Sequence, residues 1–307
     1  MNEYVLKTND LSKKYKDNLA VSKVNLSIKQ GDIYGFIGQN GAGKSTLIRL
    51  ICGLAKPTNG SVELFGQSSE SDLIQARKRI GTIIEGPALY PNMTAAENLE
   101  AHRLLKGIPG KDCVEKTLTL VGLQETRKKK AKNFSLGMKQ RLGIAIALLG
   151  DPEFLILDEP INGLDPMGVV EIRGLLKKLN QEHGITILIS SHILSELHLL
   201  ATHYGIIHNG KLIEQLSLKE LNKKCQQYLH IKVNAPNKAA AVIESHLKTK
   251  NFEVMPDGAI KLFDFLDAPG EISQTLTSQN LIIEEFMPMG EDLESYFSTR
   301  VKGVPHE

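Results

Sequence analysis

The chain has 307 residues, of which 41% are apolar, so it can bury a full hydrophobic core, and its length favours two domains over one. Its 37 basic and 35 acidic side chains nearly balance. This gives no general reason to expect nucleic-acid binding, which usually requires a clustered basic excess.

Three cysteines, Cys52, Cys113 and Cys225, lie far apart without a CxxC pair or a metal-ligand spacing. We interpret them as reduced packing residues of an intracellular protein. The first residues lack the basic start and apolar run of a secretory signal, so we expect none. No apolar run reaches the roughly 18 residues that a membrane-spanning helix needs. A role at a membrane would therefore require a partner.

The first part of the chain alternates short apolar segments with turns over residues 4–37 and ends in a compact buried strand at 33–37. A glycine-rich loop follows directly, and the apolar spacing after it predicts a helix over 46–52. Two further strands are expected at 60–66 and 80–84.

Residues 87–150 change to a helical pattern, which predicts an inserted helical subdomain. Thr94 and Glu97 have the spacing of a capping box, in which each side chain accepts the other residue's backbone N–H. Strand patterns then return, separated by helix-like stretches, at 154–157, 186–190 and 204–208. Asp165 and Pro166 form a favourable helix start, a capping carboxylate followed by proline. Strands that alternate with helices in this way imply a parallel, doubly wound α/β core.

The pattern changes again after about residue 216. The predicted elements are a strand at 228–233, a helix at 238–248, strands at 252–255 and 260–265, a helix at 271–279 and a strand at 281–286. This βαββαβ order predicts a small ferredoxin-like α+β domain over 217–307, closed by a helix at 291–299. The first domain would then span 1–216.

A phosphate-binding loop is predicted where the strand at 33–37 ends. Residues 38–45 match the pattern GxxxxGK[ST], in the strand–loop–helix setting that the pattern requires. Glycines let backbone N–H groups point at phosphate oxygens, and the helix N-terminus adds positive potential. Lys44 would span the β- and γ-phosphates and Ser45 would hold Mg²⁺. The nucleotide-binding residues expected here are Gly38, Asn40, Gly41, Ala42, Gly43, Lys44, Ser45 and Thr46. The alternative is a plain glycine-rich turn.

Two carboxylates, Asp158 and Glu159, end the apolar strand at 154–157. Ligands of parallel sheets collect at the carboxyl ends of the strands. Asp158 would bind Mg²⁺ through water, because this cation keeps part of its hydration shell. Glu159 would orient and deprotonate the attacking water. A solvated acidic strand end is the alternative.

These motifs, in this order, resemble the nucleotide-binding subunits of ATP-binding cassette (ABC) transporters, over about residues 5–220. Residues 38–45 correspond to the family's Walker A, 154–159 to its Walker B and 163–165 to its D-loop. Residues 134–138 resemble the LSGGQ signature, with Phe134, Leu136 and Met138 as departures. The fold that this resemblance implies is a P-loop cassette with a RecA-like core, an N-terminal antiparallel β subdomain and the helical subdomain.

The resemblance also implies roles for five further residues. Ser135 and Gly137 of the signature would approach the γ-phosphate held by the opposite subunit, and Asp165 of the D-loop would join the nucleotide site. His192 falls on the family's switch histidine and would contact the γ-phosphate, alongside Lys44 and Glu159 as catalytic residues. Tyr15 matches the adenine-stacking aromatic, although such a residue in a small N-terminal sheet is more often core.

Glu85 stands where the family usually has glutamine, which reaches Mg²⁺ and relays the nucleotide state to the membrane partner. A carboxylate adds negative charge beside Asp158 and Glu159, which Mg²⁺ would offset. This departure, with residues 90–94 after it, resembles the subfamily that serves bacitracin and lantibiotic self-protection exporters. An exposed loop acid is the alternative.

The implied function is that of an ATPase, with ATP and Mg²⁺ as cofactors, that powers a peptide-antibiotic exporter. Two nucleotides would lie between two ATPase subunits, most simply a homodimer, and a separate integral membrane permease would dock near 85–105 at the cytoplasmic face of the membrane. Residues 217–307 would stabilise the dimer or regulate it.

Two rival functions remain at this point. An ABC ATPase that acts on DNA repair or ribosomes usually has a long coiled coil or two fused cassettes, and this chain has neither. A small-molecule kinase would have no use for the signature, the D-loop or His192. The basic run 127–132 lacks interleaved aromatic residues, so we interpret it as a solvated loop and expect no nucleic-acid partner.

Overall fold

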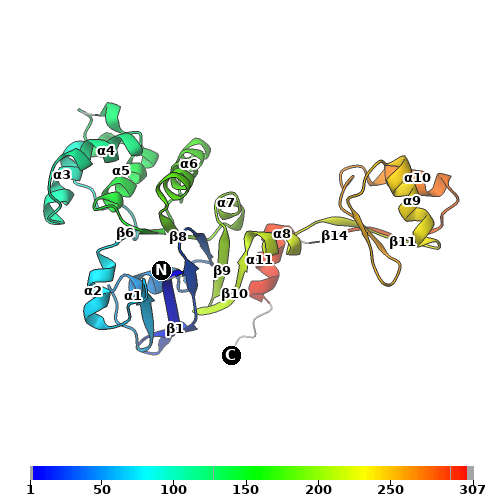
Figure 1. Cartoon of the computed structure of the whole chain (residues 1–307), viewed down its shortest axis with the longest axis horizontal. Helices are drawn as coiled ribbons and strands as arrows, with labels where there is room; N and C mark the ends of the chain where they lie inside the picture. Colours follow the sequence, from blue (N-terminus) through cyan, green and yellow to red (C-terminus); the bar gives the residue numbers. More distant parts are fainter. Residues whose placement is uncertain (1–2, 127, 291, 303–307) are drawn as a thin grey trace. The chain divides into compact units, whose positions relative to one another are not determined.

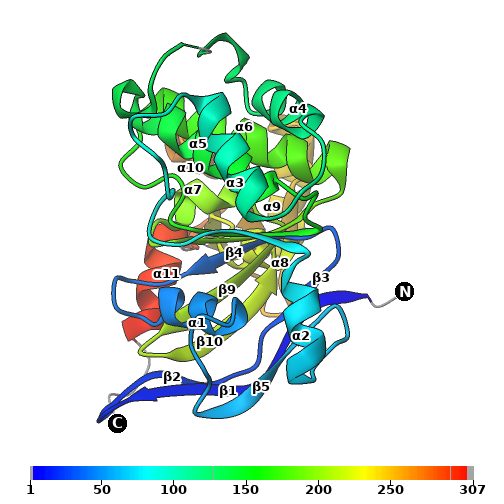
Figure 2. The same cartoon turned by 90° about the vertical axis from the view of Figure 1, so that its left-hand side faces the viewer.

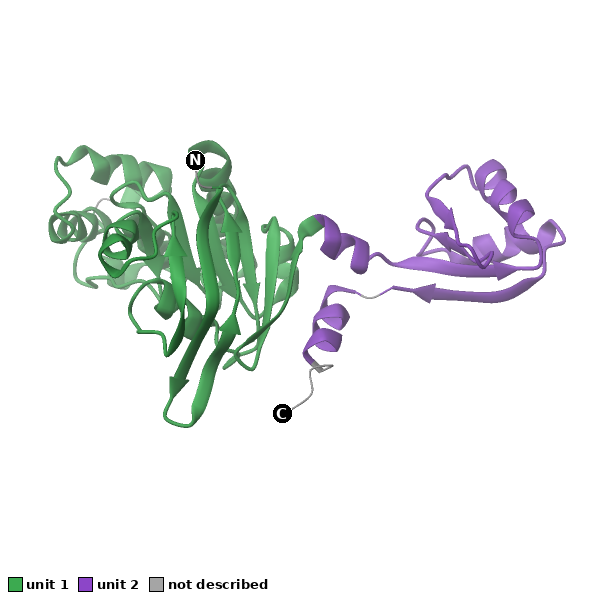
Figure 3. Cartoon of the chain, turned by 60° about the horizontal axis from the view of Figure 1, so that its bottom comes forward, with its two compact units in different colours: residues 1–218 green, residues 219–307 purple. Residues whose placement is uncertain are grey.

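The computed structural model describes residues 3–126, 128–290 and 292–302. Arg127 of the basic run and Glu291, where the last predicted helix begins, lie outside the described residues. The chain divides into two compact units, Met1–Leu218 and Lys219–Glu307 (Figure 3).

The first unit opens with an antiparallel sheet in the order β2-β1-β3, with β5 paired to β1. Its strands are β1 Tyr4–Tyr15, β2 Asn18–Val24, β3 Ser27–Lys29 and β5 Asn59–Leu64. The long strand β1 ends at Tyr15, and the short turn to β2 brings the two strand ends together. This is the N-terminal antiparallel β subdomain that the family resemblance implied.

The second sheet has six strands in the order β10-β9-β4-β8-β7-β6. They are β4 Ile33–Ile37, β6 Ile80–Ile83, β7 Phe154–Asp158, β8 Thr186–Ser191, β9 His203–His208 and β10 Lys211–Ser217. Five strands are parallel, which confirms the doubly wound core, and only β10 is antiparallel. Sequence reasoning did not predict β10. The turn before it, Asn209-Gly210, has positive φ at both residues, as a two-residue hairpin requires.

The helices of the first unit cover this sheet on both faces. They are α1 Lys44–Ile51, α2 Glu70–Arg77, α3 Ala95–Leu105, α4 Asp112–Leu120, α5 Leu136–Leu148, α6 Pro166–His183 and α7 Leu194–His198. Figures 1 and 2 place α1 and the antiparallel sheet on one side and the helical group α3–α6 on the other. Thr94 and Glu97 form the predicted capping box, and Asp165 caps α6 with Pro166 at its first turn.

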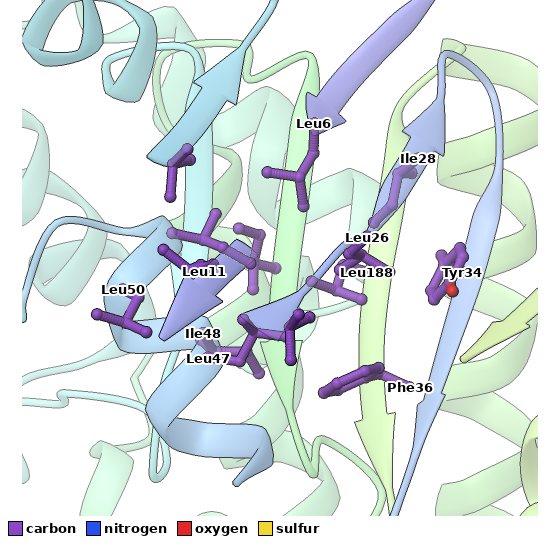
Figure 4. Close-up of a cluster of buried hydrophobic side chains, with 14 of the residues drawn as sticks. Leu6, Leu11, Leu26, Ile28, Tyr34, Phe36, Leu47, Ile48, Leu50 and Leu188 are labelled. Atoms are coloured by element: carbon purple, nitrogen blue, oxygen red, sulfur yellow. The ribbon is translucent and has the colours of Figure 1, made fainter. Parts of the chain in front are cut away.

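The core of the first unit lies between α1 and the two sheets (Figure 4). Every residue of β4 and of β7 is buried, as expected for parallel strands covered on both faces. Leu6 from the antiparallel sheet, Leu47 from α1 and Leu188 from β8 meet in this cluster. The packing holds the start of α1 and the carboxyl ends of β7 and β8 in fixed positions.

The second unit is an α+β fold. Its elements are α8 Leu218–Lys224, β11 Tyr228–Val233, α9 Pro236–His246, β12 Phe252–Val254, β13 Ile260–Leu262, α10 Pro269–Ser278, β14 Ile283–Met289 and α11 Leu293–Lys302. The antiparallel strand order β12-β13-β11-β14, with the βαββαβ succession, is that of a ferredoxin-like unit. Helix α8 was not predicted. Over the described ranges of both units, no helix combines the length and the apolarity needed to cross a bilayer.

Candidate functional site

An open cavity of about 560 Å³ lies at the start of α1, beside the carboxyl end of β7. Its lining residues are Tyr15, Asn18, Leu19, Ala20, Gln39, Asn40, Gly41, Gly43, Lys44, Ser45, Thr46, Glu159, Asn162, Asn209 and Gly210. Most of the loop residues predicted for phosphate binding therefore face one cavity. Ala42 is buried beneath it, and the Gly38 carbonyl binds the Lys44 side chain.

The glycines of the loop are required by its backbone. Gly43, which precedes α1, has φ 108°, and a Cβ at this position would lie 2.5 Å from the Ala20 carbonyl oxygen. Gly41 also has a positive φ, of 81°. The loop can therefore curl tightly against β2 and leave the free N–H groups at the start of α1 facing the cavity, where they favour an anion.

Lys44 is only 5% exposed, and its ammonium group lies at the floor of the cavity. Its Nζ donates to the Gly38 carbonyl over 2.6 Å and to the Gln39 carbonyl over 3.3 Å. Oε1 of Glu159 lies 3.1 Å from the same nitrogen. A buried cation in contact with these acceptors is held ready for an anionic ligand.

Glu159 connects Lys44 to His192. The other carboxylate oxygen of Glu159, Oε2, lies 2.8 Å from Nδ1 of His192. Glu159 has φ 50°, a left-handed conformation that turns the chain where β7 ends. Burial raises the pKa of the nearby Glu196, an effect that His192 opposes and Glu159 reinforces. The Glu159 carboxylate thus contacts Lys44 through one oxygen and His192 through the other, at the cavity wall. This position is suited to a general base.

Asp158, the last residue of β7, is 6% exposed, and its Oδ1 accepts a hydrogen bond of 2.6 Å from the Ser190 hydroxyl. It offers a carboxylate, and Ser45 a hydroxyl, which are the hard oxygen donors that Mg²⁺ prefers. Within the described part of the chain, no three His, Cys, Asp or Glu side chains gather as a metal cluster. The Asp158 carboxylate and the Ser45 hydroxyl fit a Mg²⁺ ion that would take its remaining ligands from phosphate oxygens and water.

The far end of the cavity is formed by strand ends and a hairpin. Tyr15 is exposed there, with the Lys13 ammonium 4.8 Å from its ring centroid, and it presents an aromatic face on which a base could stack. Asn209 and Gly210 also line the cavity and were missed by sequence reasoning, although the Asn-Gly pair is a known hairpin signal. Asn18, Leu19, Ala20 and Asn162 also line the cavity and belong to no motif that would have singled them out.

Asp158 and His192 do not line the cavity themselves, and three further predicted residues lie outside it at the starts of two neighbouring helices. The Ser135 hydroxyl accepts a 3.2 Å hydrogen bond from the Met138 N–H and caps α5. The Asp165 carboxylate accepts one of 3.0 Å from the Gly168 N–H and caps α6. A Cβ on Gly137 would lie 4.0 Å from the Gly168 Cα. The structure thus brings Ser135, Gly137 and Asp165 into one area and separates them from the cavity lining.

Glu85 also lies outside the cavity lining. It follows β6, has φ 61° and pairs its carboxylate with the guanidinium of Arg49 on α1. Its side chain is 65% exposed. Its assignment to Mg²⁺ stays a prediction.

Comparison with known proteins identifies the family. The profile of the ABC transporter family matches residues 21–162. The bacitracin transport ATP-binding protein BcrA of Bacillus licheniformis is 44% identical, over 97% of this chain and 98% of its own length. The chain belongs to the ABC transporter ATP-binding proteins. It is therefore an ATP-binding subunit that hydrolyses ATP, and the family resemblance noted in the sequence is confirmed.

Other relatives of this ABC subunit agree. The lantibiotic transport ATP-binding protein SrtF of Streptococcus pyogenes is 45% identical over 68% of this chain and 89% of its own. A dimeric ATP-binding cassette solved with ADP and phosphate has a TM-score of 0.63 at 28% identity, covering 69% of this chain and 98% of that one. The cbiO1 subunit of Clostridium perfringens, part of the ABC transporter complex cbiONQ, has a TM-score of 0.66 at 28% identity, covering 80% and 97%. ABC subunits of this kind dimerise and work with membrane permeases.

Proposed function

We propose that this ABC subunit powers the export of a peptide antibiotic of the bacitracin or lantibiotic type, and so provides resistance or immunity. The supporting observation is the 44% identity to a bacitracin transport subunit over nearly the whole of both chains. The subunit would act at the cytoplasmic face of the membrane, bound to a separate permease.

ATP binding follows from the cavity. The adenine base stacks on Tyr15, and the phosphates lie on the N–H groups at the start of α1, beside Lys44 and Thr46. Phosphate oxygens compete with Glu159 for the Lys44 ammonium. Binding of ATP therefore releases one carboxylate oxygen of Glu159, which can then accept a proton from water.

Hydrolysis uses Glu159 and His192 together. Glu159 orients the attacking water and removes its proton, and His192 holds the carboxylate in place and contacts the γ-phosphate. Ser45 and Asp158 would hold Mg²⁺, Asp158 through water. When bound, this ion neutralises the charge that develops on the phosphate oxygens.

A second copy of the chain completes each site. Ser135, Gly137 and Asp165 do not line the cavity of their own chain, and Leu136 between the first two is exposed. In a homodimer these residues can close over the γ-phosphate held by the opposite subunit. ATP then stabilises the dimer, and hydrolysis reopens it.

The permease is proposed to dock on the helical subdomain. An apolar groove of about 700 Å³ between α3 and α4 is lined by Met93, Ala96, Leu104 and Val114 and edged by charged side chains. Its α3 wall lies within the segment 85–105 where docking was expected, and that segment begins at Glu85. A shift of Glu85 between nucleotide states can therefore be passed to the groove through one short stretch of backbone.

The proposal is tested in a strain that is sensitive to bacitracin and carries this subunit together with the permease that co-purifies with it. Glu159→Gln is expected to bind ATP and to lose both ATP hydrolysis and resistance, whereas Lys44→Ala weakens ATP binding itself. Glu182→Gln, the same charge change on the exposed surface of α6, is the matched control and should behave as wild type. Resistance that persists in Glu159→Gln would contradict the proposal. Salt-dependent RNA or DNA binding would favour the rival function.

A further inference from the structure

Ser190 is a polar residue in the fully buried strand β8, whose centre is apolar. It lies near the end of β8, after Ile187, Leu188 and Ile189, and is 0% exposed. A hydroxyl in such a place is costly unless it is hydrogen-bonded. The strand pattern would be continued equally well by valine or isoleucine. Ser190 therefore needs an explanation beyond packing.

The hydroxyl of Ser190 joins two candidate functional residues, the last residue of the neighbouring strand β7 and the residue that follows it. Strands β7 and β8 are parallel, and their register sets Ser190 beside Asp158. Its Oγ lies 2.6 Å from Oδ1 of Asp158 and 2.9 Å from the backbone nitrogen of Glu159. One side chain thus contacts both the carboxylate assigned to Mg²⁺ and the backbone of the catalytic base.

The direction of both hydrogen bonds is fixed by chemistry. A backbone N–H can only donate, so Ser190 Oγ accepts from Glu159. An ionised carboxylate can only accept, so the hydroxyl proton must point at Asp158 Oδ1. An apolar residue at this position could make neither hydrogen bond.

We propose that Ser190 is a positioning residue for Mg²⁺ binding and for Glu159, an inference that rests on the proposed metal role of Asp158. The hydrogen bond to Oδ1 fixes the rotation of the Asp158 carboxylate and leaves Oδ2 as the oxygen that would be available to Mg²⁺ or to its water. The bond from the Glu159 N–H stabilises the left-handed backbone of Glu159, at φ 50°, where β7 turns toward Lys44 and His192. Ser190 thereby fixes the positions of Asp158 and Glu159 from the neighbouring strand β8.

The first test measures metal binding directly. Purified full-length protein is titrated with Mg²⁺ at a fixed concentration of a fluorescent, non-hydrolysable ATP analogue, and binding of the analogue is also measured in EDTA. Ser190→Ala is expected to raise the half-saturating Mg²⁺ concentration by roughly 10- to 100-fold, the usual loss when the hydrogen-bond partner of a metal ligand is removed. Binding in EDTA should stay at the wild-type level, because the cavity contacts of the nucleotide are intact.

Matched variants separate positioning from general strand stability. Thr186→Val removes another fully buried hydroxyl of β8, one that accepts the Gly31 N–H at the opposite end of the strand. It should keep the wild-type Mg²⁺ midpoint. Ser190→Thr retains the hydroxyl and should also show the wild-type Mg²⁺ midpoint. An equal shift in Thr186→Val and Ser190→Ala would overturn the inference.

Asp158→Asn distinguishes failure of the inference from failure of the proposed function. If Asp158→Asn raises the Mg²⁺ midpoint and Ser190→Ala does not, the role of Ser190 is wrong and the metal site stands. If Asp158→Asn leaves the midpoint unchanged, the metal assignment is wrong, and the inference falls with it.

Discussion

Asn98→Ala is expected to destabilise the first unit and to disorder the segment beside the proposed permease groove. Asn98 lies on α3 and is 0% exposed. Its Oδ1 accepts from the Tyr90 N–H over 2.7 Å, and its Nδ2 donates to the Tyr90 carbonyl over 3.1 Å and to the Thr94 carbonyl over 2.9 Å. One buried amide therefore fixes both ends of the segment 90–94.

The size of the effect follows from the three shortest of the four hydrogen bonds of the Asn98 amide, the fourth being to the Met93 carbonyl over 3.4 Å. Each hydrogen bond contributes about 0.5–1.5 kcal/mol net, and leaving partners unpaired adds to the loss, so the free energy of unfolding should fall by roughly 2–4 kcal/mol. For a unit of this size that lowers the unfolding midpoint by roughly 5–15 °C. Differential scanning calorimetry and urea unfolding of the full chain measure both quantities.

Two variants test the reasoning. Asn98→Asp keeps an acceptor for the Tyr90 N–H, but it replaces the donating NH2 group by a carboxylate oxygen, which faces the Tyr90 and Thr94 carbonyl oxygens. It should therefore destabilise the unit at least as much as Asn98→Ala. Asn180→Ala also removes an amide that donates to two carbonyls, over 2.8 Å and 2.9 Å, but lies away from the groove. It should keep the activity gained on adding the permease, which Asn98→Ala should lose. A free energy of unfolding for Asn98→Ala within about 0.5 kcal/mol of wild type would refute the account.

Two further predictions concern the cavity and a cysteine. Tyr15→Ala should weaken ATP binding by about 1–3 kcal/mol through loss of base stacking, whereas Tyr15→Phe should bind ATP as the wild type does. Equilibrium binding of a fluorescent ATP analogue measures both affinities. Equal affinity in the wild type and the two variants would exclude stacking. Burial raises the pKa of Cys52 from 9.0 to about 12, so at pH 8.5 it carries little thiolate. In a variant that carries Cys113→Ser and Cys225→Ser, Cys52 should react slowly with iodoacetamide until the pH nears 12 or urea unfolds the chain. Rapid labelling of Cys52 in the folded protein at pH 8.5 would contradict this.

Much of the fold could be predicted because local signals agreed with the tertiary structure. The strand predicted at 228–233 has the same bounds in the structure, since its apolar residues alternate strictly. Helices α9 and α10 begin two residues earlier than predicted, at Pro236 and Pro269, because proline is tolerated in the first helical turn. Helix α2 was missed, since only Ala76 is buried and no apolar stripe marks it. Its Ser69 cap was the one available signal.

The candidate functional residues divide in the same way, into those that a local motif predicts and those that only the fold brings together. Lys44 and Glu159 belong to motifs whose spacing is set by one loop or one strand end, so the sequence alone predicts them, and both line the cavity. Ser190 carries no such signal. Its partners lie 31 and 32 residues away, and only the pairing of β7 with β8 brings them together. The ion pair of Glu85 with Arg49 likewise joins residues from a strand end and a helix that no local pattern connects.

The central claim is that each catalytic site is shared by two subunits around bound ATP. Light scattering of Glu159→Gln with saturating Mg²⁺ and ATP, alone and with the permease, tests it most directly. The account predicts a dimer of twice 33.9 kDa that returns to monomers when ATP is removed, and no dimer when Ser135→Arg is added to the same chain. A Glu159→Gln protein that stays monomeric under both conditions would contradict it.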